Sequence, residues 1–502
     1  TAHHAMLITR SQNSLTMKKT AIFLLLLIGL AACSSPSADK PILRFHDGRL
    51  RIAQFTDIHL AVDDPKSAPV ADTLLAVITK ERPDVVILTG DIVTSQPAEK
   101  GWRHIMDIMQ RAGVPYAVTM GNHDPEVMQR DSIYDILQED PLFIGEKGPE
   151  LSGCGNYTLP ILASDSDKVS ALLYCLDSSD YTPDWALLGT YAWMPWDVTS
   201  WYREQSTRYT AQNGGTPLPA LVFCHIPTPE FRLIDQTTNM YGRNGDGSGI
   251  GSAELNSGFL LSAVEMGDVM GIFTGHDHEN DYIGQYFDIA LAYGRVSGFN
   301  AYGGLPRGAR IIDLYEGERR FDTWISTPTF SELRYHYPIG ITEDDINDME
   351  YLPSKTYTPT TQGVAYIYYE GAYKNLPDFP HKGKRIGEGV MKNFIVTDAP
   401  SEDYYGYEFE GIISIPQRDV YQFHMVCDDG ALLYIDGRLV LDFGESHSMN
   451  NRTKAKVALD AGYHDIRVVY YEDCQGEGLE ISLESLSLPR QAIPDNWLFV
   501  KE

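Results

Sequence analysis

Five short polar blocks of this chain carry residue types that bind metal ions. They are Asp57-Ile58-His59, Gly90-Asp91, Gly121-Asn122-His123-Asp124, His225 and Gly275-His276-Asp277-His278. Carboxylates, imidazoles and an amide oxygen suit iron, manganese or zinc, and no cluster of cysteines accompanies them that would indicate an iron-sulfur or structural zinc site. Two such cations, divalent or mixed-valence, would lie about 3.5–4 Å apart around one bridging carboxylate. The blocks therefore predict a dinuclear site for phosphoester hydrolysis.

Every block follows an apolar run typical of a buried strand. The runs are residues 50–55, 83–89, 114–120, 220–224 and 269–274. In open α/β sheets the carboxyl ends of the strands form the ligand-binding edge, so we expect the blocks to meet there. Gly90, Gly121 and Gly275 are expected to let the backbone turn sharply.

The order of the blocks resembles that of the calcineurin-like metallophosphoesterases, over residues 48 to 315. The resemblance implies an α/β (α+β) fold, a β-sandwich flanked by helices. It also implies two sets of metal ligands with Asp91 as the bridge. The first set is Asp57, His59 and His278, and the second is Asn122, His225 and His276.

The resemblance also implies catalytic roles. A metal-bound water would attack phosphorus in line, His123 would act as the acid, and Asp124 would orient and charge its imidazole. Arg295 could bind the substrate phosphate. Asn256-Ser257-Gly258-Phe259 and residues 275–281 are similar to the purple acid phosphatase branch, although Thr94 occupies the position of that branch's tyrosine ligand. No phenolate-to-iron colour is therefore expected.

The beginning of the chain is typical of a bacterial lipoprotein. Lys18-Lys19 precede an apolar run from Ala21 to Leu30, and small residues precede Cys33. We expect residues 17–33 to be a signal peptide with a lipobox, Cys33 to be lipidated, and residues 34–41 to be a tether in the cell envelope. An ordinary signal peptide or an uncleaved buried helix is the alternative. Residues 1–16 are treated as upstream or vector-derived.

The composition restricts the partners. The chain has 502 residues and a formal charge of −29, from 69 acidic and 40 basic residues. Such an excess of acid argues against a nucleic-acid scaffold. Without Cys33, five cysteines remain, an odd number that forbids complete pairing. Cys427 and Cys474 could pair in an oxidising compartment.

The pattern changes after the phosphoesterase-like region, which we expect to span residues 42–330. Residues 331–362 have a linker composition, residues 363–487 contain short strand-type runs, and residues 488–502 are expected to be a tail. Asp436-Gly437 predicts a hairpin turn. Residues 427–437 and 461–467 resemble the protective-antigen-type β-sandwich, which implies glycan binding and calcium at Asp428 and Asp429. These aspartates could instead only cap a turn.

Two classes of function fit these patterns. The first is a lipid-anchored metallophosphoesterase, similar to acid phosphatases, whose β-module holds a glycan or cell surface. A small phosphomonoester is the favoured substrate, and a phosphodiester is the alternative. The second is a surface glycan-binding protein with a non-catalytic phosphoesterase scaffold.

Overall fold

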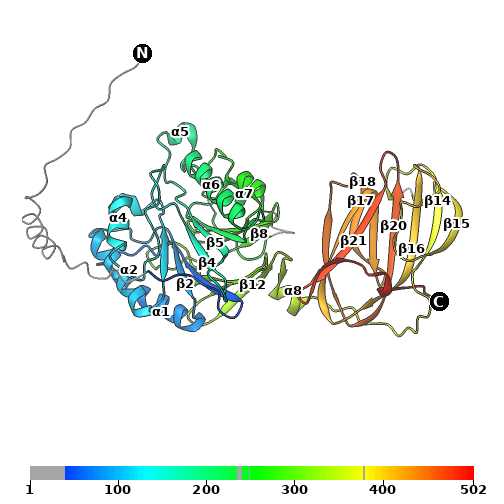
Figure 1. Cartoon of the computed structure of the whole chain (residues 1–502), viewed down its shortest axis with the longest axis horizontal. Coiled ribbons are helices and arrows are strands. Elements are labelled where there is room, and N and C mark those ends of the chain that lie inside the picture. The colour runs from blue at the N-terminus through cyan, green and yellow to red at the C-terminus, as the bar shows by residue number, and fades with distance from the viewer. Residues whose placement is uncertain (1–39, 235–239, 248, 377–378, 381, 502) are drawn as a thin grey trace, which may run out of the picture.

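The computed structural model describes residues 40–234, 240–247, 249–376, 379–380 and 382–501. The expected signal peptide and Cys33 lie outside the described residues. The chain forms an α/β lobe and a C-terminal all-β lobe, with the short helix α8 between them (Figure 1). The expected fold class is thus confirmed.

Two β-sheets form the centre of the α/β lobe. The seven-stranded sheet has the order β13-β12-β11-β10-β1-β2-β3, and the six-stranded sheet has the order β4-β5-β6-β7-β9-β8. The first contains β13 (Ile341–Thr342), β12 (Ser331–Tyr337), β11 (Phe321–Ser326), β10 (Ala309–Tyr315), β1 (Arg49–Phe55), β2 (Val85–Thr89) and β3 (Tyr116–Thr119). The second contains β4 (Tyr157–Leu162), β5 (Val169–Cys175), β6 (Ala220–Phe223), β7 (Val269–Thr274), β9 (Ile289–Tyr293) and β8 (Ile283–Tyr286).

The five apolar runs form β1, β2, β3, β6 and β7, as expected. Strands β1, β2 and β3 run parallel, as do β6 and β7, so the polar blocks of each sheet emerge from one edge. Every residue of β2, β3, β6 and β7 is buried, which explains their continuous apolar sequences.

Helices cover the outer faces of the two sheets (Figure 1). Beside the first sheet lie α1 (Val70–Glu81), α2 (Ala98–Ala112) and α4 (Arg130–Leu137), and beside the second lie α6 (Trp196–Gln212) and α7 (Phe259–Met266). The short helices are α3 (Asp124–Val127) and α5 (Trp185–Leu188), and α5 lies at the outer end of the lobe. Helix α2 buries Trp102, Ile105 and Met109 on one face and ends at Gly113, whose φ is 67°. No helix of the described residues is long and apolar enough to cross a membrane.

The all-β lobe is a sandwich of ten strands. They are β14 (Val364–Glu370), β15 (Lys384–Met391), β16 (Tyr405–Ile415), β17 (Asp419–Ile435), β18 (Arg438–His447), β19 (Thr453–Leu459), β20 (Gly462–Glu472), β21 (Gly478–Ser485), β22 (Leu488–Ala492) and β23 (Leu498–Phe499). Strand β17 pairs with β19 and β21 through its first part and with β18 and β20 through its last part. It therefore belongs to both layers. Asp436 and Gly437 form the expected turn, with φ of 50° and 81°.

Two expected boundaries differ from the structure. Residues 331–342 are edge strands of the first sheet, because β12 pairs with β11 and β13 pairs with β12. Residues 488–499 are part of the sandwich, because β22 pairs with β21 and β23 pairs with β16. Their polar, alternating side chains suit half-exposed edge strands and resemble those of a linker or tail.

The two lobes are in direct contact. Ile339 and Ile341 pack with Val420 and Ala458 of the sandwich in one buried cluster. Asp345 of α8 (Glu343–Asp348) forms an ion pair with Lys456. Asp288 lies 3.1 Å from the guanidinium of Arg452. Apolar packing and charge pairing thus both connect the lobes.

Candidate metal centre

The polar blocks of the α/β lobe converge where the strand ends of its two sheets meet. The amide of Asp57, after β1, donates to the carbonyl of Gly90, after β2, at 3.1 Å. The amide of Gly275, after β7, donates to the carbonyl of His225, after β6, at 3.0 Å. The amide of His276 donates to the Asp57 carboxylate at 2.9 Å and so connects the two sheets. Hydrogen bonds between loops therefore fix the centre.

Six of the side chains form two groups that could each hold a metal ion. The first is Asp57, His59 and His278, and the second is Asp91, His225 and His276. In the first, Nε2 of His278 lies 3.2 Å from Oδ1 of Asp57. In the second, Nε2 of His225 lies 3.1 Å from Oδ2 of Asp91. That same Asp91 oxygen lies 3.7 Å from Nε2 of His59, so Asp91 lies between the groups, as a bridging carboxylate must.

Four atoms of the centre are buried without a hydrogen-bond partner. They are Oδ1 of Asp57, Nε2 of His59, Oδ1 of Asn122 and Nδ1 of His278. The amide nitrogen of Asn122 donates to the hydroxyl of Tyr181 at 2.9 Å, which holds the side chain in one orientation. Each buried orphan costs about 1–3 kcal/mol, a penalty that a cation would remove. The residues therefore fit a dinuclear metal site.

The backbone of the centre is strained at four positions. Asp57, His59, Asp91 and His276 have φ of 52°, 46°, 51° and 80°. Residues other than glycine rarely adopt this region, and each such residue costs about 1–3 kcal/mol. Such strain is typical of functional sites, where the surrounding structure enforces it.

The three glycines of the blocks act in two ways. Gly90 has φ of 78° and turns the chain as expected. Gly121 and Gly275 do not have positive φ. They provide space, because a Cβ at Gly121 would lie 2.2 Å from Oδ1 of Asp91 and one at Gly275 would lie 1.8 Å from Oγ1 of Thr56.

Electrostatics prepares most of these groups to bind cations. Burial lowers the pKa of His276 to about 3 and that of His59 to about 4, so both imidazoles stay neutral, as ligands must be. Burial opposes ionisation of Asp57, but His278 and His225 outweigh it and hold its pKa well below the usual range. For His225, burial is outweighed by Asp91, which raises its pKa to about 10. A cation at His225 would displace that proton.

His123 and Asp124 have different surroundings from those expected. Nδ1 of His123 lies 3.0 Å from the carboxylate of Glu126, and its ring is half-exposed beside His59. Asp124 is fully buried and accepts hydrogen bonds from backbone amides, so its expected contact with the imidazole was wrong. The donors are Asp91, Ile92, Val93 and Gly121, at 2.9, 2.9, 3.1 and 2.8 Å. Glu126 orients His123, and Asp124 joins the loops that follow β2 and β3.

Arg295 does not reach the substrate region. It is 1 % exposed, and its guanidinium bonds Asp281 at 2.5 Å, Glu332 at 2.8 Å and the carbonyl of Pro306 at 3.0 Å. The expected phosphate contact was therefore wrong, because Arg295 instead connects β12 with the loops that precede β8 and β10.

A cavity of about 540 Å³ opens above the metal centre. The ring of Tyr191 meets His276 at 4.4 Å between centroids, and that of Tyr302 meets His278 at 4.0 Å. Arg232 is a cation of the cavity wall, and it is paired with Glu254 at 3.3 Å. Sequence reasoning missed these wall residues because they lie in loops without a recognisable motif.

A third acidic cluster lies in the sandwich. Asp428 and Asp429 of β17 lie close to Glu472, the last residue of β20. Oε1 of Glu472 is buried without a hydrogen-bond partner, and Oε2 accepts from Tyr470 at 3.0 Å. Three carboxylates suit a hard cation such as calcium. Sequence reasoning found the aspartates but missed Glu472.

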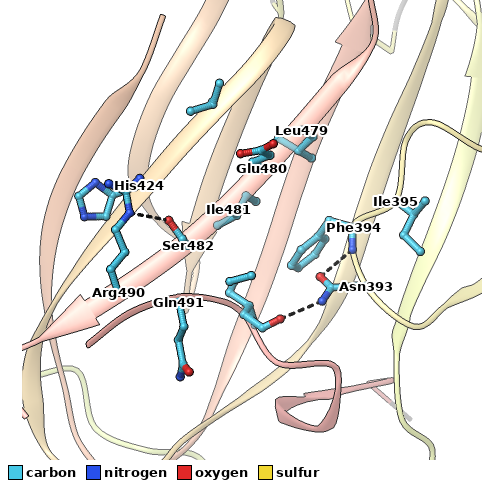
Figure 2. A pocket seen from close by; sticks show the side chains of 13 residues that line it. Asn393, Phe394, Ile395, His424, Leu479, Glu480, Ile481, Ser482, Arg490 and Gln491 are labelled. Carbon is cyan, nitrogen blue, oxygen red and sulfur yellow. Dashed lines mark hydrogen bonds between the residues drawn. The ribbon is translucent and has the colours of Figure 1, made fainter. Parts of the chain in front are cut away.

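The sandwich also has a cavity of about 490 Å³ beside β21 (Figure 2). Phe394 and Ile481 line it, and Arg490 donates to Ser482 at 3.2 Å. His424 pairs with Glu484 at 2.8 Å. These polar groups already bond one another, so the cavity identifies no ligand.

The cysteines of the described residues are all free thiols. Cys427 is buried and Cys474 is exposed, and they do not pair, so the disulfide alternative was wrong. Cys224 is buried beside His225, with its pKa raised to about 12 by burial.

Residues 50–280 match the model of the calcineurin-like phosphoesterase, and residues 361–496 match that of the PA14 domain. The chain is 30% identical to the "probable inactive purple acid phosphatase 29" of Arabidopsis thaliana, over 59% of this chain and 86% of that protein. It is 28% identical to the "probable inactive purple acid phosphatase 14" of the same plant, over 61% and 86%. A solved "PA14 sugar-binding domain from RTX adhesin" is 16% identical and covers 28% of this chain and 100% of its own, with a TM-score of 0.25.

Proposed function

Since the chain belongs to the calcineurin-like phosphoesterase family and also carries a PA14 domain, we propose that it is a metal-dependent phosphoric monoester hydrolase with a glycan-binding module. The observation that carries the proposal is the pair of adjacent ligand groups, in which Asp91 of the second lies 3.7 Å from His59 of the first and buried ligand atoms lack a hydrogen-bond partner. The two cations, iron, manganese or zinc, would supply Lewis acidity that activates a water and draws charge from the phosphoryl oxygens.

The chain's own residues would do the remaining work. Asp57, His59 and His278 would hold one cation, and Asn122, His225 and His276 the other, with Asp91 shared between them. His123 would protonate the departing oxygen from its Nε2, because Glu126 engages its Nδ1. Tyr191 and Tyr302 support two of the ligand imidazoles and narrow the approach.

Turnover is the decisive measurement, because the names of the two Arabidopsis relatives described above contain the word inactive. We expect two metal ions per chain and hydrolysis of an aryl monophosphate, abolished by Asp91→Ala and reduced at least about 100-fold by His123→Gln. His104→Gln is the matched control, since His104 is exposed on α2. Two bound metals without turnover of any phosphoester would favour the alternative, a non-catalytic scaffold beside a glycan-binding module.

The preference for monoesters is tested by comparing an aryl phosphate with a bis-aryl phosphate. The similarity of the chain to purple acid phosphatases supports the monoester. Equal or faster cleavage of the diester would instead identify a phosphodiesterase with the same mechanism.

We propose that Asp428, Asp429 and Glu472 bind calcium and that this cluster anchors a glycan. The unpartnered Glu472 oxygen supports a cation there. Calorimetry with calcium, followed by a glycan array with and without the ion, tests both steps. Asp429→Asn should abolish both, and Asp442→Asn, an exposed change on β18, is the control.

We further propose that Cys33 is lipidated and holds the protein on the bacterial cell envelope. The small residues before Cys33 and the apolar run from Ala21 to Leu30 support this. Cys33→Ser should release the protein from the membrane fraction, and mass spectrometry of the mature N-terminus should find the lipid.

A further inference from the structure

A short ribbon connects the metal centre to an exposed tip. The amide of Thr182 donates to the carbonyl of Thr190 at 3.0 Å, and the amide of Ala192 donates to the carbonyl of Asp180 at 2.9 Å. Tyr191, at the base of the ribbon, packs on the candidate ligand His276. Helix α5 is the tip of the ribbon and lies at the outer end of the α/β lobe (Figure 1).

The tip exposes large apolar side chains. Trp185 is 75 % exposed and Leu187 is 78 % exposed. The side chain of Asp184 accepts from the amide of Leu187 at 3.2 Å and fixes this turn. Grouped exposed apolar side chains of this kind are typical of a binding face, and Thr190 and Tyr191 at the other end of the ribbon line the cavity.

Two other segments of the cavity wall repeat this arrangement. Arg232 lines the cavity, and its neighbour Leu233 is 56 % exposed. Glu254 also lines it, and its neighbour Leu255 is 48 % exposed. The segments adjoin, because Arg232 pairs with Glu254 and a Cβ at Gly189 would lie 2.5 Å from Cγ of Glu254. Trp185, Leu187, Leu233 and Leu255 are called the apolar rim below.

We propose that the apolar rim binds the hydrocarbon chain of the substrate and that the substrate is an amphiphilic phosphomonoester, a phosphate group on a single alkyl or prenyl chain. The inference rests on the proposed function, because the metal centre would hold the phosphate. The hydrocarbon would leave the cavity over the outer side of the contact between Gly189 of the ribbon and Glu254.

Reach and charge both support this substrate class. Leu187 is four residues from Tyr191, so their backbones are at most about 14 Å apart, within reach of a medium-length chain. Residues 181–202, which include the tip of the ribbon, contain no lysine or arginine. Arg232 of the cavity wall is already paired with Glu254. A mouth with exposed apolar side chains and a paired cation disfavours polyanionic leaving groups such as nucleotides and accepts hydrocarbon.

A series of alkyl phosphates from methyl to decyl, kept below their critical micelle concentrations, tests the rim. We expect kcat/KM of the metal-loaded protein to rise two- to fourfold per methylene, the upper limit corresponding to about 0.8 kcal/mol for complete burial. The double variant Trp185→Ser with Leu187→Ser should flatten that slope. Ile386→Ser is the matched control, since Ile386 is 46 % exposed on β15 of the other lobe.

Binding of alkyl phosphonates, measured by calorimetry, gives a second readout that needs no turnover. If affinity rises with alkyl chain length in the wild type but not in the double variant, the apolar rim binds hydrocarbon. This conclusion holds even if the protein hydrolyses no phosphoester, because a lack of hydrolysis would contradict only the proposed function. The inference is overturned if neither kcat/KM nor affinity of the wild type depends on alkyl chain length. It is also overturned if the double variant retains the same dependence on chain length. The inference is also overturned if activity rises only when neutral vesicles are added and kcat/KM of monomeric substrates does not depend on chain length. The apolar rim would then bind a bilayer.

Discussion

Replacing Asp124 by asparagine should damage the metal centre without removing any candidate ligand. Both carboxylate oxygens are buried, and each accepts two backbone amides. The donors belong to the loop after β2, which carries Asp91, and to Gly121 after β3. One side chain therefore sets the spacing of two strand ends.

The cost follows from the hydrogen-bond inventory. Asparagine keeps one oxygen and presents an amide group in place of the other, so two of the four backbone donors lose their acceptor. A buried, unsatisfied donor costs about 1–3 kcal/mol, which gives a total of about 2–6 kcal/mol. A domain of this size loses roughly 2–4 °C in melting temperature per kcal/mol, so we expect a decrease of roughly 5–20 °C.

Tryptophan fluorescence during thermal and urea unfolding measures this loss. Six of the seven tryptophans lie in the α/β lobe and only Trp497 lies in the sandwich, so the signal reports mainly on the phosphoesterase domain. Elemental analysis of the same samples should show less than two metals per chain, because the loop of Asp91 loses its support.

Asp107→Asn is the matched control, because Asp107 is exposed on α2 and pairs with Arg111 only at 3.6 Å. It should change stability by less than about 0.5 kcal/mol. If Asp124→Asn were as stable as this control and kept both metals, the role assigned to Asp124 would be refuted.

Three further predictions concern the two sites. Glu126→Gln should lower kcat about tenfold with KM little changed, because His123 loses the carboxylate that orients it. An unchanged kcat in steady-state kinetics would show that this contact does not contribute to catalysis. Chelation should lower the melting temperature of the α/β lobe, since orphan atoms and strained backbone lose their compensation, and manganese or zinc should restore it. Burial, then Asp429 and Asp428, raises the pKa of Glu472 from 4.5 to about 8 against the hydrogen bond from Tyr470. The calcium-free sandwich should therefore lose stability as pH rises from 4.5 to 8, because the fold retains a proton that the unfolded chain releases, and a pH series of melting curves should become flatter in Glu472→Gln.

The sequence predicted the metal ligands best where each ligand directly follows a strand with a clear apolar pattern. Asp57, Asp91 and His276 follow apolar strands of parallel sheets, so their meeting point could be predicted from strand ends alone. The partner of Asp124 could not, because backbone amides have no sequence signature. Arg295 was misassigned for a related reason, since its position after the last block says nothing of the buried Asp281 that it faces.

Longer-range pairing explains what else was missed. Glu472 is far from Asp428 in sequence and comes near it only because β17 and β20 are neighbours. The edge strands β12 and β22 were predicted as linker and tail because a polar edge strand has a loop-like composition.

The buried contact of Ile339 and Ile341 with Val420 and Ala458 has a mechanical consequence. A binding module on a flexible linker lets the attached domain reach a large volume, whereas a module in rigid contact restricts that domain to positions near the bound ligand. With this contact intact, and with a glycan bound to the sandwich as proposed, only phosphoesters at a fixed distance from that glycan would reach the metal centre. Disrupting the contact would enlarge the accessible volume and lower the effective concentration of each phosphoester within it.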